Sequence, residues 1–265
     1  MNDLFLYTLH LADNALILGH RNSEWTGHGP VLEQDIAISN IALDLLGQAR
    51  NFYQYAAQLP INGELQFMKR TSVKELTEDT LAYLRDAHEF NNCLLVEQPN
   101  GDWAATILRQ FFFSTYQYYF YNQLQHSKDE TLAAISEKAL KEVTYHTRWS
   151  AEWVIRLGDG TDESHSRMQR AMDNLWKFTG ELFQPSNYEF QLIADNISVD
   201  LAPLKPMWDE KVNAVLAEAM LTDESGKRQK AWMQTGGKEG RHTEHLGYVL
   251  AEMQYLQRAY PDSAW

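Results

Sequence analysis

Three carboxylates lie where a helical bundle could hold a pair of metal ions. Asp13, Asp44 and Glu142 each fall inside a long stretch of helical periodicity. A di-iron carboxylate bundle takes a Glu from each of two helices and a Glu-x-x-His motif from each of the other two, because carboxylates bridge the irons and imidazoles fill terminal positions. These residue types therefore point to di-iron chemistry, provided that the other ligands are present.

The spacing predicts which carboxylates meet. The midpoint between Asp13 and Asp44 is position 28.5, inside the turn expected over residues 27–30. In an antiparallel helical hairpin both arms rise about 1.5 Å per residue, so residues equidistant from the turn lie at the same height. We therefore expect Asp13 to face Asp44.

One of the expected helices has no carboxylate to contribute. From Ala104 to Lys128 the sequence contains neither Asp nor Glu. Reflection about Lys128 puts Ser114, beside Phe113, opposite Glu142, where a ligand would be required. This helix is therefore expected to supply no ligand in any register.

Both imidazoles are missing as well. The two Glu-x-x-His positions are Asp44 with Gly47 and Glu142 with Tyr145, so each has an acid and neither has a histidine. A site that lacks these ligands loses most of its coordination of iron. The pattern predicts a degenerate di-iron site, with no catalytic residue and no metal in this chain.

A lysine is predicted to replace the missing metal charge. Lys138, Glu142 and Tyr145 recur at i, i+4 and i+7, which puts them on one helix face. An unpaired buried charge costs several kcal/mol, so Lys138 is expected to neutralise Glu142 inside the bundle. Two alternatives remain open. The carboxylates could bond helix neighbours or face solvent, or they could hold a metal together with His146.

A second candidate site is the Gly-rich stretch over residues 236–241. Its glycines, Lys238, Arg241 and the helix N-terminus that follows would suit an anion such as a carboxylate or phosphate. The same stretch also suits a structural cap or a contact with a partner subunit, which we favour. It overlaps the match to Glu-x-x-His at Glu239 and His242, but a loop position indicates a chance match.

Long helices are expected to carry these residues. Helical periodicity and the few Gly and Pro residues predict helices over about residues 3–25, 31–59, 73–89, 102–126, 129–157, 162–183, 207–220 and 243–260. No composition break marks a linker, so we expect one all-α bundle domain over residues 1–265. The second helix is apolar almost all round, and the fourth carries an aromatic block over residues 111–121. We assign both to the core and to a subunit interface.

Composition excludes several classes of protein. Lys and Arg number 23 against 36 Asp and Glu, for a net charge of −13, which argues against nucleic-acid and anionic-membrane binding. The single cysteine, Cys93, excludes a disulfide framework. The start of the chain has no positively charged leader, and no apolar run is long enough for a membrane span. We therefore expect a soluble cytoplasmic protein.

Five segments carry a more specific pattern. They are residues 33–57 with Asp44-Leu-Leu-Gly-Gln-Ala-Arg-Asn51, Leu94-Leu-Val-Glu-Gln-Pro-Asn-Gly101, Lys138-Ala-Leu-Lys-Glu-Val-Thr-Tyr-His146, Leu157-Gly-Asp-Gly-Thr-Asp162 and Thr235-Gly-Gly-Lys-Glu-Gly-Arg-His-Thr-Glu-His-Leu-Gly247. These segments closely resemble the structural (C) subunits of phenylacetyl-CoA 1,2-epoxidase complexes, which are ring-epoxidising multicomponent monooxygenases. The similarity spans nearly the whole chain.

The resemblance implies a fold and a function. It implies a ferritin-like four-helix bundle with additional helices, which has lost its metal and forms a stable hetero-oligomer with a di-iron catalytic subunit. That complex would serve aerobic phenylacetate catabolism in the bacterial cytoplasm, with a reductase supplying electrons from NADPH. This chain would be a structural subunit without independent activity, with phenylacetyl-CoA as an indirect partner. The alternative is an active carboxylate-bridged di-metal oxygenase or oxidase in its own right.

Overall fold

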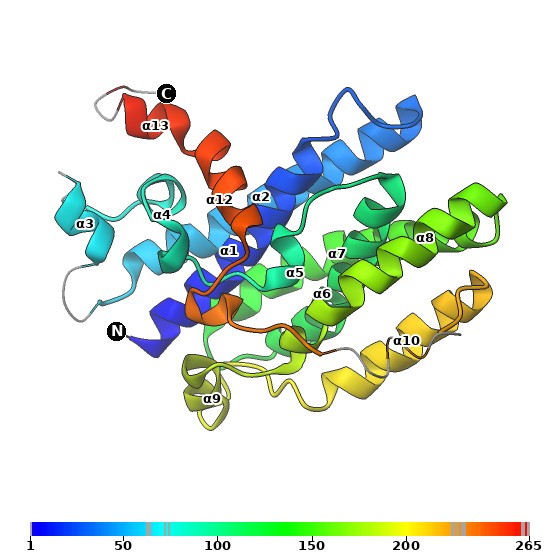
Figure 1. The fold of residues 1–265 in the computed structure, drawn as a ribbon. Helices are drawn as coiled ribbons and strands as arrows, with labels where there is room; N and C mark the ends of the chain where they lie inside the picture. Colours follow the sequence, from blue (N-terminus) through cyan, green and yellow to red (C-terminus); the bar gives the residue numbers. More distant parts are fainter. Residues whose placement is uncertain are drawn as a thin grey trace. The chain divides into compact units, whose positions relative to one another are not determined.

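The chain forms two compact units in a computed structural model (Figure 1). The structure describes residues 2–61, 65–71, 75–223 and 232–260, and the single residues 73, 226, 228 and 263. Unit 1 comprises Met1–Gln98, Ser186–Leu192 and Gly236–Trp265, and unit 2 comprises Pro99–Pro185 and Ile193–Thr235. The prediction of one domain over residues 1–265 stays a prediction.

Unit 1 is built on a long helical hairpin. Helices α1 (Asp3–Ser23) and α2 (Leu32–Gln58) pack lengthwise against each other, as Figure 1 shows. Asn2 caps α1, because its side chain accepts a hydrogen bond from the Leu4 N–H. Between Asp3 and Ser23, α1 buries polar as well as apolar residues, including His10, Asp13 and Asn14. The hairpin therefore presents charged groups to the interior of the unit.

Short elements complete unit 1. They are α3 (Gln66–Arg70), α4 (Glu78–Tyr83), η1 (Ala87–Glu89), α5 (Leu94–Glu97), most of α9 (Asn187–Ile193), η4 (Gly237–Glu239), α12 (Glu244–Met253) and α13 (Tyr255–Ala259). Three segments that are far apart in the sequence, around α5, α9 and η4, thus belong to the same unit as α1.

Unit 2 is built on two further long helices. Helices α6 (Trp103–Leu124) and α7 (Glu130–Gly158) pack lengthwise, and α8 (Asp162–Leu175) and α10 (Leu204–Glu218) lie against them. The short turns η2 (Trp176–Phe178) and η3 (Gly180–Phe183) follow α8. The side chains of Asp102 and Asp129 cap α6 and α7, as their positions in the sequence indicate. An aromatic core fills this unit.

The all-α prediction is confirmed, since the regular structure in the described residues is helical. The four longest predicted helices are found within about three residues of their expected ends. The helix expected over residues 73–89 is wrong, because Thr77 caps a short helix that ends at Tyr83. The helix expected to end at Phe183 changes into two 3-10 turns after Leu175, and the last helix is interrupted at Gln254.

None of the helices in the described residues combines the length and the apolar character that crossing a membrane requires.

Candidate functional site

Asp13 lies at the centre of a buried hydrogen-bonding cluster in unit 1. Its side chain is fully buried in α1, and both of its oxygens accept hydrogen bonds. The Tyr53 hydroxyl donates to Oδ1 at 2.5 Å, and the Asn91 backbone N–H donates to Oδ2 at 2.7 Å. Arg85 donates to both oxygens, from Nη1 to Oδ2 at 3.1 Å and from Nη2 to Oδ1. A guanidinium thus balances the charge of this carboxylate.

The surrounding structure holds Arg85 in place. Its Nε donates to the Leu81 carbonyl at 2.6 Å and its Nη1 donates to the Glu89 carbonyl at 2.7 Å. The guanidinium carbon lies 4.1 Å from the centre of the Phe90 ring, which is a cation–π distance. Burial alone would lower the pKa of Arg85, but the charge of Asp13 raises it above its ordinary value. Arg85 therefore stays charged.

The electrostatics of this cluster favour a fixed ion pair over a metal ligand. Burial, together with the negative charge of Asp13, raises the pKa of Tyr53 well above its ordinary value, so the phenol stays protonated as a donor. A metal ion would have to displace Arg85, Tyr53 and a backbone amide from Asp13. The residues around Asp13 therefore do not fit a metal, and the alternative site that adds His146 loses its first carboxylate.

The expected meeting of Asp13 with Asp44 is wrong. The predicted register puts Ile38 opposite Gly19, but the Cβ position of Gly19 lies 3.3 Å from side-chain atoms of Leu45 and Leu46. This difference of seven residues or more is about two helical turns. Equal rise along both arms was a sound assumption, but the connecting loop folds back beside α2 and shifts the register.

Hydrogen bonds of that loop show the shift directly. The Thr26 and Ser39 hydroxyls lie 3.0 Å apart, and the Gly29 N–H donates to Asp35 Oδ2 at 2.8 Å. Residues 26–29 therefore run alongside the first two turns of α2 instead of joining the helices symmetrically. Asp44 is half-buried and Gly47 is exposed, so neither belongs to the buried cluster around Asp13.

The predicted ligand face of α7 is its outer face. Lys138 and Tyr145 are exposed and Glu142 is half-buried, whereas Val143 and His146 are fully buried. The predicted compensation of a buried Glu142 by Lys138 is therefore wrong, since the three residues share a face as expected but that face meets solvent. The carboxylate that is fully buried in α1 is Asp13, and its counter-charge is the buried Arg85.

The hairpin of α6 and α7 is shifted in the same direction. The Thr147 hydroxyl donates to the Ser114 carbonyl at 3.0 Å, and the Ser114 and Ser150 hydroxyls lie 3.3 Å apart. Ser114 is therefore level with residues 147–150 and not with Glu142. Phe113 is buried, as expected of a core aromatic. Tyr121 lies near the C-terminal end of α6. Burial raises the pKa of its hydroxyl, and the charge of Glu142 raises it further.

The Gly-rich stretch over residues 236–241 packs against other segments of unit 1. Lys238 is only 3% exposed and pairs with Glu189, from Nζ to Oε2 at 2.9 Å and to Oε1 at 3.2 Å. The proposed anion contact by Lys238 is wrong, because a buried carboxylate of the same unit already occupies the ammonium. Arg241 is exposed and pairs with Glu239 at 2.6 Å, so a partner contact by Arg241 stays a prediction.

The glycines of this stretch serve close packing. A Cβ on Gly237 would lie 2.3 Å from the Asn92 carbonyl oxygen, and a Cβ on Gly240 would lie 2.3 Å from that of His88. Gly240 also has a φ of +78°, in the left-handed region that favours glycine. The structural interpretation of these glycines is supported, because they let the stretch approach residues 88–94 of the same unit.

The Glu-x-x-His match has no metal-binding role in this arrangement. His242 Nδ1 lies 2.8 Å from Glu97 Oε2, and its Nε2 lies 2.9 Å from the Phe90 carbonyl oxygen. Burial by itself would lower the pKa of His242, but the hydrogen bond and charge of Glu97 raise it above its ordinary value. Both ring nitrogens are thus used by the protein.

The sequence analysis missed the buried acids of unit 1. Glu97 accepts hydrogen bonds from the Thr243 N–H and hydroxyl, both at 2.7 Å. Glu189 pairs with Lys238, and His10 Nε2 lies 3.9 Å from Glu189 Oε1. Burial would raise the pKa of Glu189, but the charge of Lys238 brings it below its ordinary value. Glu97 follows three apolar residues in the sequence, and Glu189 lies between Tyr188 and Phe190, which was the available signal. Arg85 had no such signal.

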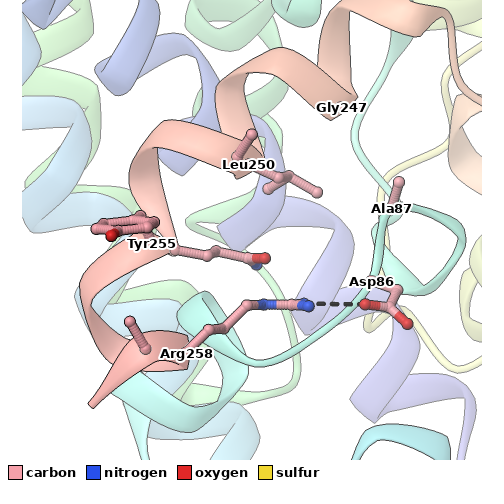
Figure 2. A pocket seen from close by; sticks show the side chains of 9 residues that line it. Asp86, Ala87, Gly247, Leu250, Tyr255 and Arg258 are labelled. Carbon is pink, nitrogen blue, oxygen red and sulfur yellow. Dashed lines mark hydrogen bonds and ion pairs between the residues drawn. The ribbon is translucent and has the colours of Figure 1, made fainter. Parts of the chain in front are cut away.

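A surface hollow of about 500 Å³ lies on unit 1 beside α12 and α13. Figure 2 shows Arg258 reaching Asp86 across it, where Nη2 lies 2.9 Å from Oδ1. The other lining residues are mostly small or apolar; they are Ala87, Gly247, Leu250, Ala251, Gln254, Tyr255 and Ala259. The lining holds no nucleophile with an adjacent base, so the hollow lacks the groups of a catalytic site.

Within the described residues, no group of three or more His, Cys, Asp or Glu side chains is placed to hold a metal ion.

Comparison with known proteins gives two findings. The chain matches the model of a family described as phenylacetic acid catabolic protein (PaaA_PaaC) over residues 1–265, and this family is ferritin-like. It is also 49% identical over 265 residues, all of both chains, to a protein of Escherichia coli (strain K12) named as the C subunit of 1,2-phenylacetyl-CoA epoxidase. The resemblance stated from the sequence segments is confirmed.

Proposed function

Since the chain belongs to the phenylacetic acid catabolic protein family, we propose that it is the non-catalytic structural subunit of a phenylacetyl-CoA 1,2-epoxidase complex. In this proposal the chain forms a stable hetero-oligomer with the di-iron catalytic subunit, in a cytoplasmic complex that also includes a reductase. The chain itself carries no cofactor and meets phenylacetyl-CoA only through its partner.

The proposal rests mainly on Asp13, because both of its carboxylate oxygens already accept hydrogen bonds from the protein. A carboxylate that bridges two irons must offer its oxygens to the metal, but those of Asp13 accept from Arg85, Tyr53 and the Asn91 N–H. Removing a guanidinium from a buried carboxylate would cost several kcal/mol before any metal could bind. The cluster supports a structural role for Asp13 in place of metal binding.

A second observation supports the same role. The buried residues of α6 between Trp103 and Leu124 are aromatic, aliphatic, amide, hydroxyl and one arginine, with no carboxylate among them. Iron favours carboxylate and imidazole ligands, and this helix has neither. A bundle with one such helix is suited to supporting a catalytic subunit of the same family.

Metal content and turnover test the proposal together. The chain and the catalytic subunit are produced separately, each in iron-rich medium, and the iron of each is measured by elemental analysis. We expect less than about 0.1 iron per copy of this chain. We also expect the two proteins to elute together after mixing. Turnover of phenylacetyl-CoA by the mixture should depend on the iron bound to the catalytic subunit.

Two results would contradict the proposal. About two irons per copy of this chain would favour an active di-metal oxygenase or oxidase. Independent elution at micromolar concentration, with full turnover by the catalytic subunit alone, would remove the structural role. As a control, Asp13→Asn with Arg85→Met keeps a neutral cluster, and it should leave the iron content unchanged.

A further inference from the structure

We propose that one proton, shared by His242 and Glu97, holds the start of α12 against α5, and that α12 loosens when a rise in pH removes this proton. The contact formed by His242, Thr243 and Glu97 is named the α12 clasp. Helix α12, orange-red in Figure 1, packs against both α1 and α5. The inference goes beyond the proposed function and concerns this chain by itself.

Both ring nitrogens of His242 face hydrogen-bond acceptors. Nδ1 lies 2.8 Å from Glu97 Oε2, and Nε2 lies 2.9 Å from the Phe90 carbonyl oxygen. A neutral imidazole has one N–H and can donate to only one of these oxygens, whereas an imidazolium donates to both. The geometry therefore requires a second proton at this site.

That proton lies on His242 and not on Glu97. The fully buried Glu97 carboxylate also accepts from the Thr243 N–H and hydroxyl, both at 2.7 Å, and from Asn92 Nδ2 at 2.9 Å. With His242, these donors use all four acceptor positions of the carboxylate and leave none for a proton of its own. The His242 side chain is only 4% exposed, so the α12 clasp contains a buried imidazolium and carboxylate.

The folded chain holds this proton to higher pH than the unfolded chain does. Burial alone would lower the pKa of His242, but the hydrogen bond and the charge of Glu97 raise it above 6.5. The pair therefore stabilises the fold fully below about pH 6.5, and this stabilisation is lost as the pH rises through the raised pKa. After the loss, a ring nitrogen faces an oxygen atom with no hydrogen bond between them.

Charged groups of α1 also face the α12 clasp. Asp13 adds to the raised pKa of His242, and its own charge is paired with Arg85. Arg21 donates to the Glu97 carbonyl, from Nε at 3.2 Å and from Nη2 at 2.9 Å. Other titratable groups of α1 are neutral near pH 7 or paired elsewhere; they include His10, His20 and Glu24.

The titratable side chains of η1, which also packs against α12, have partners elsewhere. The His88 ring lies 3.3 Å from the Gln66 amide oxygen, and Glu89 accepts from the N–H groups of Phe67 and Asp86. The titratable side chains beside His242 in its own segment are paired, exposed or half-buried; they are Lys238, Glu239, Arg241, Glu244 and His245.

Other contacts of α12 do not need a proton that is lost near neutral pH. Arg21 Nη2 donates to the His245 carbonyl at 3.2 Å. After the last residue of α12, Gln254 Nε2 donates to the Ala82 and Arg85 carbonyls at 3.2 and 2.9 Å. Guanidinium and amide donors keep their protons well above neutral pH. Loss of the proton should therefore make α12 open more often while unit 1 stays folded.

Hydrogen exchange of the full-length chain tests the α12 clasp. Exchange is measured by mass spectrometry between about pH 6 and 8.5, and the rates are corrected for the intrinsic pH dependence of exchange. We expect the protection of α12 in the wild type to fall at least about tenfold over this range, because each unit of pKa shift is a factor of ten. The protection of α6 in unit 2 should stay constant.

Three variants connect the change to the proton. His242→Gln removes the titrating ring, so the protection of α12 should be low and independent of pH. Glu97→Gln removes the charge that holds the proton, and should move the change at least about one unit towards lower pH. His245→Gln is the matched control, because it removes a half-buried imidazole three residues away, and should keep the wild-type pH dependence. Circular dichroism of each variant checks its folding.

Nitrogen NMR of the wild-type chain with 15N-labelled histidine measures the proton directly. We expect His242 to carry protons on both ring nitrogens at pH 7. A neutral His242 ring at pH 6, or wild-type protection of α12 that does not change with pH, overturns the inference. So does His245→Gln if it abolishes the pH dependence. The two wild-type measurements decide the inference even where a variant fails to fold.

Discussion

The two units stabilise their interiors by different means. Unit 1 buries the ion pairs Asp13–Arg85, Glu189–Lys238 and Glu97–His242. Unit 2 buries an aromatic cluster in which Trp208 lies 5.6 Å from Phe112, 5.8 Å from Trp176 and 5.5 Å from Phe183, measured between ring centres. Both units contain a long helical hairpin, so the difference comes from what covers it.

The backbone of the covering segments explains this difference. In unit 1 short irregular segments cover the hairpin, and their N–H and C=O groups need partners that a helix would supply internally. Asp13 accepts from the Asn91 N–H, Asn14 accepts from the Cys93 N–H, and Glu97 accepts from the Thr243 N–H. In unit 2 the covering helices α8 and α10 satisfy most of their own backbone groups, so the core can be aromatic. Buried carboxylates of unit 1 thus supply acceptors to the irregular backbone that covers its hairpin.

The largest effect is expected from removing the counter-charge of Asp13. Arg85→Met should lower the free energy of unfolding by about 3–5 kcal/mol, because it leaves a buried carboxylate unpaired and removes the donor to the Leu81 and Glu89 carbonyls. Urea unfolding followed by circular dichroism would measure this. The double change Asp13→Asn with Arg85→Met should recover part of the loss.

Lys138→Met is the matched control, because it removes a cation from an exposed position of unit 2. Its effect should stay below about 0.5 kcal/mol. Similar losses for Arg85→Met and Lys138→Met would contradict the assignment of the buried counter-charge to Arg85.

Acid sensitivity should be a property of unit 1. Burial lowers the pKa of His20, on α1, from 6.5 to about 4. Because the unfolded chain takes up this proton first, stability falls as the pH drops from about 6.5 towards 4, by at most about 3 kcal/mol. The difference in unfolding free energy between the wild type and His20→Gln should change by that amount over this range. A difference that is independent of pH would contradict it.

A substitution in the aromatic core of unit 2 should lower the free energy of unfolding by less, and by the same amount at each pH. Trp208→Phe removes the indole donor, which bonds the Phe112 carbonyl at 2.9 Å, and leaves a small void. We expect a loss of about 1–2 kcal/mol at every pH between 5 and 8. Urea unfolding at several pH values would measure it. A loss that grows on acidification would make the contrast between the units wrong.

The class of fold and the long helices could be predicted because their causes are local. Helical periodicity and side-chain caps act over a few residues, so Asp102 and Asp129 marked the starts of α6 and α7 correctly. The absence of acids from residues 104–128 was also readable without a structure. The sequence segments carried the family resemblance for a similar reason, since they needed no knowledge of contacts.

The short elements could not be predicted in the same way. Helices α3, α5 and α9 have four to seven residues, too few for a periodic pattern, and isolated helices of that length are unstable without tertiary packing. The helix expected over residues 73–89 failed because Thr77 begins α4 locally while Arg85 turns to the buried Asp13. The buried site depended on these segments.

The long helices, the place of Asp13 in one of them and the lack of a carboxylate helix opposite Glu142 follow from the sequence alone. The contacts of Asp13 depend on tertiary packing. Arg85 lies 72 residues away and reaches it through an irregular segment, and a loop that folds back along α2 shifts the hairpin by about two turns. Local rules specify the rise and face of each helix, but the axial offset between helices depends on the packing of the loop and of distant segments.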